Sequence, residues 1–399
     1  MRSLGAQRRD LAEDEGRRIP GRIAIVHDWL DTWGGAELAL VELLALYPDA
    51  DVFTLVDFMS PADRARLGSR TIRTSFIQRL PFASKRFRRY LPLFPRAVER
   101  FDVSGYDLVI SSSHAVAKGV PTSAAQLHLC YCYTPMRYAW DLQEDYLHQV
   151  GLDRGLKGLA VRRMLARLRE WDRTTAARVD HFVAISHTIA DRIRRCYERE
   201  STVIFPPVAA NAHPVAHPRG SAYVTVSRLV PYKRVDLIVS AFRLLPDREL
   251  IVIGDGPEKA RVMAAAGPNV RLLGRTADAE RDRWLATARA FVFAADEDFG
   301  IAPLEAQACG TPVIAFGRGG AAETICGLDT TQPTGVLFHE QTPESIAAAV
   351  RTFEANVHRI SAVACRANAA RFSAQRFRDE FAAFVAARQT EFRDPGRAR

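Results

Sequence analysis

Short apolar runs typical of buried strands alternate with segments of helical pattern along nearly the whole chain. The first pair is RIAIVHDWL followed by GGAELALVELLALYP, in which apolar residues recur at the helical period. Strands that are apolar on both faces belong to parallel sheets covered by helices on both sides. The alternation therefore predicts an α/β protein built on parallel sheets.

A stretch rich in Pro, Asn and Gly, FPPVAANAHPVAHPRG, divides this pattern into two halves. The length of 399 residues also exceeds one typical domain. We therefore predict two Rossmann-like domains that face each other across a cleft, with ligands bound at the carboxyl ends of the strands. The predicted boundaries are a disordered tail at 1–20, an N-terminal domain at 21–205, a linker at 206–220, a second domain at 221–375, and a C-terminal helix and tail at 376–399 that packs back on the N-terminal domain.

The composition narrows the class of protein. Six cysteines without zinc-ligand spacing favour reduced thiols in a cytoplasmic protein. The chain has no run of about 18 apolar residues for a membrane span, and its polar N-terminus lacks the apolar segment of a signal peptide. The formal net charge of +9 is concentrated in residues 61–100, where 11 Arg or Lys stand against Asp63 and Glu99. Such a segment favours an anionic partner: a lipid surface, a nucleic acid or a phosphorylated substrate.

The densest motif is EDFGIAPLE, which places Glu297 and Glu305 eight positions apart. Glu297 ends the loop after a strand, and Glu305 lies about one turn into the next helix. The amides of Phe299, Gly300 and Ile301 should then stand at the helix amino end, where unpaired N–H groups and the helix dipole suit hydroxyls and phosphate. A capped helix carrying two surface carboxylates is the alternative.

Two cations follow the first strand of the second half, Arg228 and Lys233 in SRLVPYKRVD. Cations at the carboxyl end of a strand suit a diphosphate, and each charge-assisted hydrogen bond is worth about 1.5–3 kcal/mol. A solvated loop would have the same composition. Gly254 lies in IGDGPE, which is a common type of turn. The GRGGAA at 317–322 fits a dinucleotide fingerprint but comes too late in its domain, so only a glycine loop that approaches a phosphate is retained.

The first half offers weaker signals. Gly34 and Gly35 join the first strand to the first helix and could approach a phosphate, although a tight turn needs the same residues. His114 follows a strand and should stand at the cleft, although a single histidine is more often structural. Lys118 and the YTPMRYAWD loop add polar and aromatic groups suited to sugar rings and an acceptor, and the residues singled out there are Tyr133, Arg137 and Trp140.

Together these strings resemble glycosyltransferase family 4, whose members retain anomeric configuration and have the two-domain GT-B fold. The resemblance covers about residues 22–385, and EDFGIAPLEAQACGTPVIAFGRGGAAET carries it most specifically. HDWLDTWGGAE and CYCYTPMRYAWD look closer to bacterial mannosyltransferases that build O-antigen and exopolysaccharide from GDP-mannose. Asp298 stands where the common family loop has glycine, which matches that branch.

The resemblance implies a role for each matching residue. Glu297 would bind hydroxyls of the transferred sugar, with the amides of residues 299–301, and Glu305 would hold the ribose. Arg228 and Lys233 would neutralise the leaving diphosphate in place of a metal. The remaining implied positions are Gly34 and Gly35 under the phosphate, His114 near the C6 hydroxyl of the sugar, and Arg275 near the base.

The implied reaction is front-face substitution with retention, without cofactor or metal. DAD at 49–51 and DED at 296–298 resemble metal-binding pairs, but this fold does not use such pairs. The alternatives are a UDP-sugar donor, a nucleotide-sugar 2-epimerase, and a basic nucleic-acid binder. The chain lacks the recognition motifs of the last class, so we expect no nucleic-acid partner.

The basic segment 61–100 interleaves Phe, Leu and Tyr with Arg and Lys in FIQRLPFASKRFRRYLPLFPRAVERF. This is the pattern of a helix lying on an anionic membrane. We therefore predict a peripheral protein at the inner face of the cell membrane that meets a lipid-linked glycan acceptor there. The alternative is a solvated basic face whose apolar residues lie in the domain core.

Overall fold

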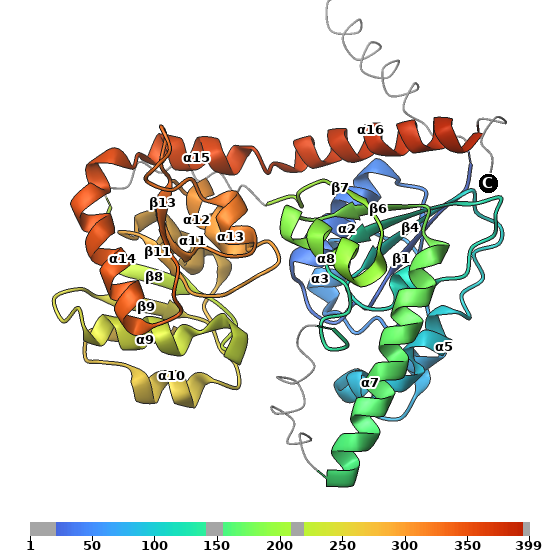
Figure 1. The fold of residues 1–399 in the computed structure, drawn as a ribbon, viewed down its shortest axis with the longest axis horizontal. Coiled ribbons are helices and arrows are strands. Elements are labelled where there is room, and N and C mark those ends of the chain that lie inside the picture. The colour runs from blue at the N-terminus through green and yellow to red at the C-terminus, as the bar shows by residue number, and fades with distance from the viewer. Residues whose placement is uncertain (1–20, 141–154, 209–218, 394–399) are drawn as a thin grey trace, which may run out of the picture. The chain divides into compact units, whose positions relative to one another are not determined.

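The computed structural model describes residues 21–140, 155–208 and 219–393 (Figure 1). The chain divides into two compact units, which are described separately. Unit 1 comprises residues 1–185, 189–205 and 377–399, and unit 2 comprises residues 186–188 and 206–376.

Unit 1 is built on a seven-stranded parallel sheet of order β3-β2-β1-β4-β5-β6-β7. The strands are β1 (Ile23–His27), β2 (Asp51–Thr54), β3 (Ile72–Thr74), β4 (Leu108–Ser113), β5 (Leu127–Cys132), β6 (His181–Ala184) and β7 (Ser201–Val203). Its main helices are α2 (Gly35–Leu46), α7 (Gly155–Thr175), α8 (His187–Tyr197) and α16 (Ala374–Arg393). Every residue of β4 and β5 is buried, as expected for strands covered on both faces.

Unit 2 is built on a six-stranded parallel sheet of order β10-β9-β8-β11-β12-β13. The strands are β8 (Tyr223–Val226), β9 (Leu250–Ile253), β10 (Val270–Gly274), β11 (Phe291–Phe293), β12 (Val313–Phe316) and β13 (Gly335–Phe338). The helices are α9 (Val235–Arg243), α10 (Lys259–Ala265), α11 (Asp278–Thr287), α12 (Ile301–Ala308), α13 (Gly320–Thr324), α14 (Pro343–Asn356) and α15 (Ala362–Ala370). Consecutive residues Tyr223 and Val224 belong to two different apolar cores, so the sheet buries both faces.

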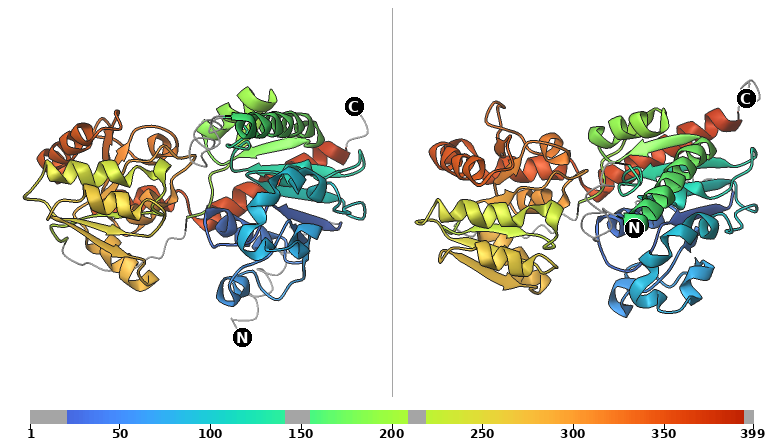
Figure 2. Two further views of the ribbon diagram at one scale, coloured as in Figure 1. Left: turned by 90° about the horizontal axis from the view of Figure 1, so that it is seen from below. Right: turned by 60° about the horizontal axis from the view of Figure 1, so that its bottom comes forward.

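These two sheets confirm the predicted α/β class with two Rossmann-like domains. Helices lie on both faces of each sheet in the views of Figure 2. The strand order reverses beside β1 in unit 1 and beside β8 in unit 2. At such a reversal the loops after the two neighbouring strands leave in opposite directions and open a crevice at their carboxyl ends. The loops after β1, β4, β8 and β11 are therefore the first places to look for a site.

The C-terminal helix α16 belongs to unit 1 from Phe377 onward. Phe377 and Phe381 are buried and pack edge-on against the ring of Tyr131 on β5, at 5.4 and 6.0 Å between centroids. Arg378 forms an ion pair with Glu42 on α2. The last helix of the chain thus completes the apolar core of the first domain.

The basic segment 61–100 is not the single membrane-lying helix that the sequence suggested. It forms the short pieces α3 (Pro61–Ala65), β3, η1 (Phe76–Arg79), α4 (Ala83–Arg86), η2 (Phe87–Leu93) and α5 (Phe94–Val98). Proline lacks the backbone N–H of a continuous helix, and residues 81, 92 and 95 are prolines. Ile77, Phe87, Leu91 and Phe94 are buried in the core, as the alternative interpretation expected. Phe82 remains 77% exposed.

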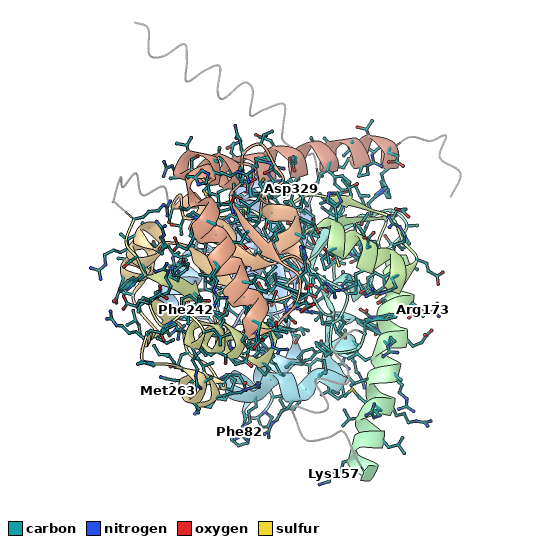
Figure 3. The ribbon with its side chains drawn as sticks, turned by 60° about the vertical axis from the view of Figure 1, so that its left-hand side comes forward. Phe82, Lys157, Arg173, Phe242, Met263 and Asp329 are labelled. Atoms are coloured by element: carbon teal, nitrogen blue, oxygen red, sulfur yellow. The ribbon has the colours of Figure 1, made fainter. Side chains whose placement is uncertain are left out.

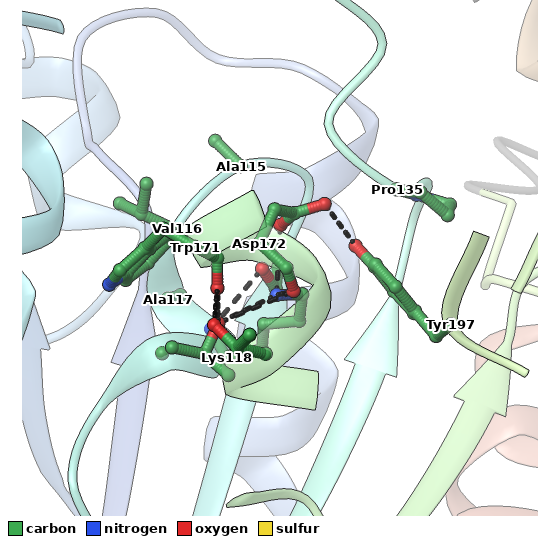
Figure 4. A network of polar contacts seen from close by, with 12 residues as sticks. Ala115, Val116, Ala117, Lys118, Pro135, Trp171, Asp172 and Tyr197 are labelled. Carbon is green, nitrogen blue, oxygen red and sulfur yellow. Dashed lines mark hydrogen bonds and ion pairs between the residues drawn. The ribbon is translucent and has the colours of Figure 1, made fainter. Parts of the chain in front are cut away.

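A buried polar cluster ties η3 (Ala117–Gly119) to α7 (Figure 4). The Lys118 ammonium lies 2.8 Å from a carboxylate oxygen of Asp172 and also donates to the Thr175 hydroxyl. The other carboxylate oxygen of Asp172 accepts from Tyr197 and Trp140, each at 2.8 Å. Lys118 is 1% exposed, so the suggestion that it serves sugar or acceptor was wrong. Its partners hold it in the core.

Replacing Asp172 with Asn should strongly destabilise unit 1. The change leaves the Lys118 ammonium buried without a counter-ion, a loss of about 3–5 kcal/mol. Denaturant unfolding monitored by tryptophan fluorescence measures it. Glu170→Gln on the same helix is the control, because Glu170 forms only an exposed pair with Arg173 and should change stability by less than about 0.5 kcal/mol. Equal stability of the two variants would contradict the assignment.

Candidate active site

The predicted catalytic residues all follow strands at the two reversal points. Arg228 and Lys233 follow β8, Glu297 follows β11, and His114 directly follows β4. The described part of the chain thus places them where parallel sheets present ligands. Unit 2 carries Arg228, Lys233 and Glu297, and unit 1 carries His114.

Lys233 and Glu297 contact each other directly in unit 2. Lys233 ends the short helix η5 (Pro231–Lys233), and its ammonium also lies 5.8 Å from the ring centroid of Phe293 on β11. The two side chains are 18% and 16% exposed, so the pair is shielded without being sealed. Sequence reasoning assigned the two residues separate roles and did not pair them. Together they offer a cation and an acceptor at one point.

The amino end of α12 stands next to this pair. Gly300 is the residue before the helix and adopts a left-handed conformation with φ of +82°, which favours glycine. Within the described residues no side chain caps this end of α12. Phe299 is buried against Phe372, with 5.7 Å between ring centroids. The loop is thus anchored while the first N–H groups of the helix lack a capping side chain.

The glycines of the GRGGAA motif have a structural role in the loop that carries Glu297. A Cβ on Gly319 would lie 2.2 Å from the carbonyl oxygen of Glu297, and one on Gly320 would lie 2.1 Å from that of Phe299. The Gly320 N–H donates to the Glu297 carbonyl at 2.7 Å. These glycines let two backbone segments touch. They fix the loop that carries Glu297, which accounts for the motif without a phosphate.

Glu305 on α12 has an unfavourable setting for its charge. Burial raises the pKa of Glu305 above its ordinary value of 4.5, nearby Arg281 opposes this shift, and Asp282 and Asp278 add to it. Arg281 on α11 was missed by sequence reasoning, because a helical arginine carries no signal of what it faces. Glu305 is therefore a carboxyl whose ionisation costs folding free energy.

Gly254 and Arg275 follow β9 and β10. Gly254 has φ of +141°, and a Cβ there would lie 1.8 Å from the Ser227 carbonyl oxygen, so this turn packs against the residue that precedes Arg228. The positive charge of Arg275 contributes, after the Gly256 N–H and Lys259, to lowering the pKa of Asp255. The turn after β9 therefore lies beside both predicted donor-binding arginines.

In unit 1 the amino end of α2 is joined to the sheet by a buried polar chain. Gly34 precedes α2, and Glu37 in its first turn lies 3.5 Å from Nε2 of buried His27. Nδ1 of His27 lies 3.0 Å from the Ser112 hydroxyl, which lies 3.0 Å from the hydroxyl of Tyr133. The Tyr133 hydroxyl in turn donates to the carbonyl of Ala36, the residue after Gly35. His27, Glu37 and Ser112 were missed. The available signal for His27 and Ser112 was their polar character inside apolar strands, whereas Glu37 is an acidic residue in the first turn of α2.

His114 lies over buried Asp28 in the same unit. The Asp28 carboxylate accepts hydrogen bonds of 2.6–2.8 Å from four consecutive backbone N–H groups, beginning with that of His114. The His114 ring packs edge-on against Trp29 at 4.4 Å between centroids. Burial lowers the pKa of His114, and the Asp28 charge opposes that shift. The burial of the ring therefore favours its neutral form.

The three acceptor-side residues meet different surroundings. The Tyr133 hydroxyl and the Trp140 indole are engaged inside unit 1, by Ala36 and Asp172 respectively. Arg137 lies half-buried between them in sequence. Residue 141, the last of the YTPMRYAWD loop, lies outside the described residues.

Two features are absent from the residues that the structure describes. None of their helices has both the length and the apolar character that a bilayer span requires. Their His, Cys, Asp and Glu side chains form no group of three or more that could hold a metal ion.

Two family models match the chain, one for each unit. The model for glycosyl transferases group 1 matches residues 216–372, and the model for Glycosyltransferase Family 4 matches residues 33–211. The first range contains the Lys233–Glu297 pair, and the second contains His114 with its neighbours.

Curated relatives match parts of the chain. A GDP-mannose-dependent monoacylated alpha-(1-6)-phosphatidylinositol monomannoside mannosyltransferase of Corynebacterium glutamicum is 38% identical over 126 residues, which are 28% of this chain and 32% of that protein. A D-inositol 3-phosphate glycosyltransferase of Mycolicibacterium gilvum is 29% identical over 187 residues, 43% of this chain and 41% of that protein. The chain thus matches about a third to two fifths of the length of these relatives.

Solved structures match over nearly the whole chain. HepE of Anabaena, determined in complex with UDP, gives a TM-score of 0.64 at 19% identity and covers 92% of this chain and 100% of its own. Sucrose-phosphate synthase of Thermosynechococcus elongatus gives a TM-score of 0.66 at 17% identity, with 93% and 100% covered. At such identities the likeness shows a common fold.

Glu305→Gln should gain stability over the wild type as pH rises. A carboxyl whose pKa is raised in the folded state binds its proton more tightly there than in the unfolded chain, so its stabilising contribution is lost above pH 4.5. Glutamine lacks this dependence. Melting temperatures of both proteins between pH 4 and pH 7 should show a difference that grows in favour of the variant. The control variant Glu344→Gln changes an exposed carboxylate and should show no such trend. A Glu305→Gln variant whose melting temperature falls relative to the wild type as pH rises would contradict the assignment.

Proposed function

Because the chain belongs to glycosyltransferase family 4, we propose that it transfers mannose from GDP-mannose to a lipid-linked or polysaccharide acceptor. The transfer retains the anomeric configuration and serves the synthesis of cell-surface polysaccharide. The single observation that carries this proposal is the Lys233–Glu297 contact beside the uncapped amino end of α12. A nucleotide-sugar donor offers a diphosphate, which suits Lys233 and the N–H groups of α12, and sugar hydroxyls, which suit Glu297.

Each group has a defined task in this proposal. Lys233 and Arg228 stabilise the negative charge that develops on the diphosphate as the glycosidic bond breaks, and fixed cations need no reorganisation at that moment. Glu297 accepts hydroxyls of the sugar, and N–H groups at the start of α12 donate to the donor. Without donor, Lys233 and Glu297 neutralise one another, so each side chain is already held at the site before binding.

The proposed reaction retains the anomeric configuration. The acceptor oxygen attacks the anomeric carbon of the sugar from the same face that the diphosphate leaves. A phosphate oxygen of the leaving diphosphate takes the proton of the acceptor hydroxyl. Because the cations stabilise the diphosphate directly, this reaction needs no divalent metal. His114 serves as a neutral imidazole beside a sugar hydroxyl, where it can accept a hydrogen bond.

Two relatives bear on the choice of donor. The Corynebacterium enzyme is named for GDP-mannose, whereas HepE was determined with UDP. The sequence match to the first is the closer in identity, so GDP-mannose is our first candidate. A UDP-sugar is the second, supported by the structural likeness.

We also propose that unit 1 docks on an anionic membrane, at the inner face of the cell membrane, through the basic segment 61–100. Phe82 supports this, because a bulky aromatic residue with φ of +57° and 77% exposure is costly for an isolated domain. Figure 3 shows Phe82 at the outer edge of unit 1. Exposed cations flank it in sequence, namely Arg79, Lys85, Arg86, Arg88 and Arg89. Inserted into a bilayer, the ring would lie among lipids while these cations meet acidic headgroups.

The donor proposal predicts that GDP and GDP-mannose raise the melting temperature more than UDP or UDP-glucose do, because a ligand stabilises the fold that binds it.

Lys233→Ala and Glu297→Ala should each reduce transfer by about 10²–10³-fold without loss of fold. The rate of mannose transfer is measured in the presence of EDTA, with GDP release as the readout. Glu344→Ala, an exposed carboxylate on α14, should keep wild-type turnover. Activity that depends on added Mg²⁺ or Mn²⁺ would overturn the metal-independent mechanism. Formation of an epimerised nucleotide sugar in the absence of an acceptor would overturn the proposal that the protein is a transferase.

The membrane proposal predicts that the protein floats with liposomes containing phosphatidylglycerol and not with pure phosphatidylcholine. Each cation near the surface contributes about 1 kcal/mol, so Lys85→Ser with Arg86→Ser should weaken binding by tens of fold. Phe82→Ser should weaken it as well. Met263→Ser is the matched control, because Met263 is an exposed apolar residue of unit 2, 56% exposed. Binding that ignores lipid charge would refute the proposal.

A further inference from the structure

Asp28 is a fully buried carboxylate next to a residue with a proposed role in transfer. We propose that Asp28 is a positioning residue, which fixes the ring orientation and the tautomer of His114. The inference rests on the proposed function only in that His114 acts on the donor sugar. The contact between the two residues can be tested without any substrate.

The carboxylate organises the whole turn after β4. Oδ2 accepts from the N–H groups of His114 and Ala115, at 2.6 and 2.8 Å, and Oδ1 accepts from those of Val116 and Ala117, both at 2.7 Å. Four donors from consecutive residues therefore converge on one side chain from β1. An amide at position 28 could not accept all four, because its nitrogen is a donor.

The same carboxylate faces the His114 ring. Nδ1 lies 3.2 Å from Oδ2, and the His114 side chain is 26% exposed. A carboxylate oxygen repels a nitrogen lone pair, so the neutral ring should carry its hydrogen on Nδ1. Nε2 is then the hydrogen-bond acceptor at the opposite edge. Trp29 packs against one edge of the ring at 4.4 Å between centroids, and the Tyr133 ring lies at 6.2 Å.

Burial and the surrounding charges together shift the pKa of this ring. Burial lowers the pKa of His114 below 6.5, Asp28 opposes the shift, His27 and Arg88 strengthen it, and Glu37 opposes it. His27 and Glu37 come from β1 and α2, and Arg88 comes from η2, so these groups face the ring from several elements. Removing the Asp28 charge should therefore move the pKa of His114 further down.

The first test is nitrogen NMR of the histidine rings in the full-length protein, with His114 assigned by the His114→Gln variant. The wild type should show His114 with hydrogen on Nδ1 and a pKa below 6.5. Asp28→Asn should lower that pKa further and mix the tautomers. If Asp28 only held the backbone of the turn after β4, Asp28→Asn would leave the pKa of His114 unchanged.

The second test is a double-mutant cycle on transfer. Misplacing a contacting group by about 1 Å can cost about a hundredfold in rate, so Asp28→Asn should reduce kcat by about ten- to a hundredfold. In a His114→Ala background the same change should cost less than about threefold, because the residue it acts through is absent. Asp57→Asn is the control, since Asp57 follows the neighbouring strand β2 and pairs with Arg64.

The outcomes separate the two proposals. Equal losses in both backgrounds, with an unmoved His114 titration, would overturn the positioning role. A wild type that transfers no sugar while the NMR results hold would overturn the proposed function alone. If Asp28→Asn does not fold, the wild-type tautomer decides, and hydrogen on Nε2 would refute the inference.

Discussion

The predicted site residues of both units depend on one constraint of parallel sheets, which is that every strand delivers its following loop to the same edge. Where the strand order reverses, two neighbouring loops turn away from each other and leave backbone and side chains accessible. In unit 2 these are the loops after β8 and β11, and Lys233 and Glu297 meet there. In unit 1 they are the loops after β1 and β4, and Asp28 and His114 meet there. Each sheet thus joins one basic group to one carboxylate at its reversal point.

The two pairs differ in what surrounds them, and this difference suits different tasks. Asp28 is fully buried, with four backbone N–H groups and the His114 ring around it, so a ligand cannot reach it. Lys233 and Glu297 keep about a sixth of their surface exposed, so either can exchange its partner for a ligand group. A sealed carboxylate can orient its neighbour, whereas a shielded but open pair can bind.

Much of this arrangement could be predicted from the sequence. The apolar strand runs gave the correct fold class, because strands buried on both faces need that composition whatever their order. The positions of Lys233, Glu297 and His114 after strands followed from the same pattern. Their pairing did not, because which side chains meet depends on the strand order, and the sequence alone does not specify it. Asp28 and Arg281 were missed for this reason.

The errors have equally specific causes. Lys118 follows a strand and so resembled a site residue, but Asp172, 54 positions later, turns its ammonium into the core. The apolar and basic residues interleaved in 76–101 resembled a helix lying on a membrane, but three prolines break the segment into short turns that bury most of its apolar residues. Local pattern describes what a segment can form, and a distant partner or a missing N–H decides what it does form.

Stability and binding make opposite demands on unit 2. Glu305 is held in a setting that disfavours its charge, although Arg281 offsets part of this. A carboxylate that is poorly compensated in the free protein still has unused capacity to accept hydrogen bonds, so a ligand that donates them gains more than it would from a satisfied group. Gly319 and Gly320 hold the Glu297 loop through backbone contact, which leaves the side chain of Glu297 free of that structural task. The unit therefore fixes the Glu297 loop by backbone packing, which does not use the charged side chains that we propose for donor binding.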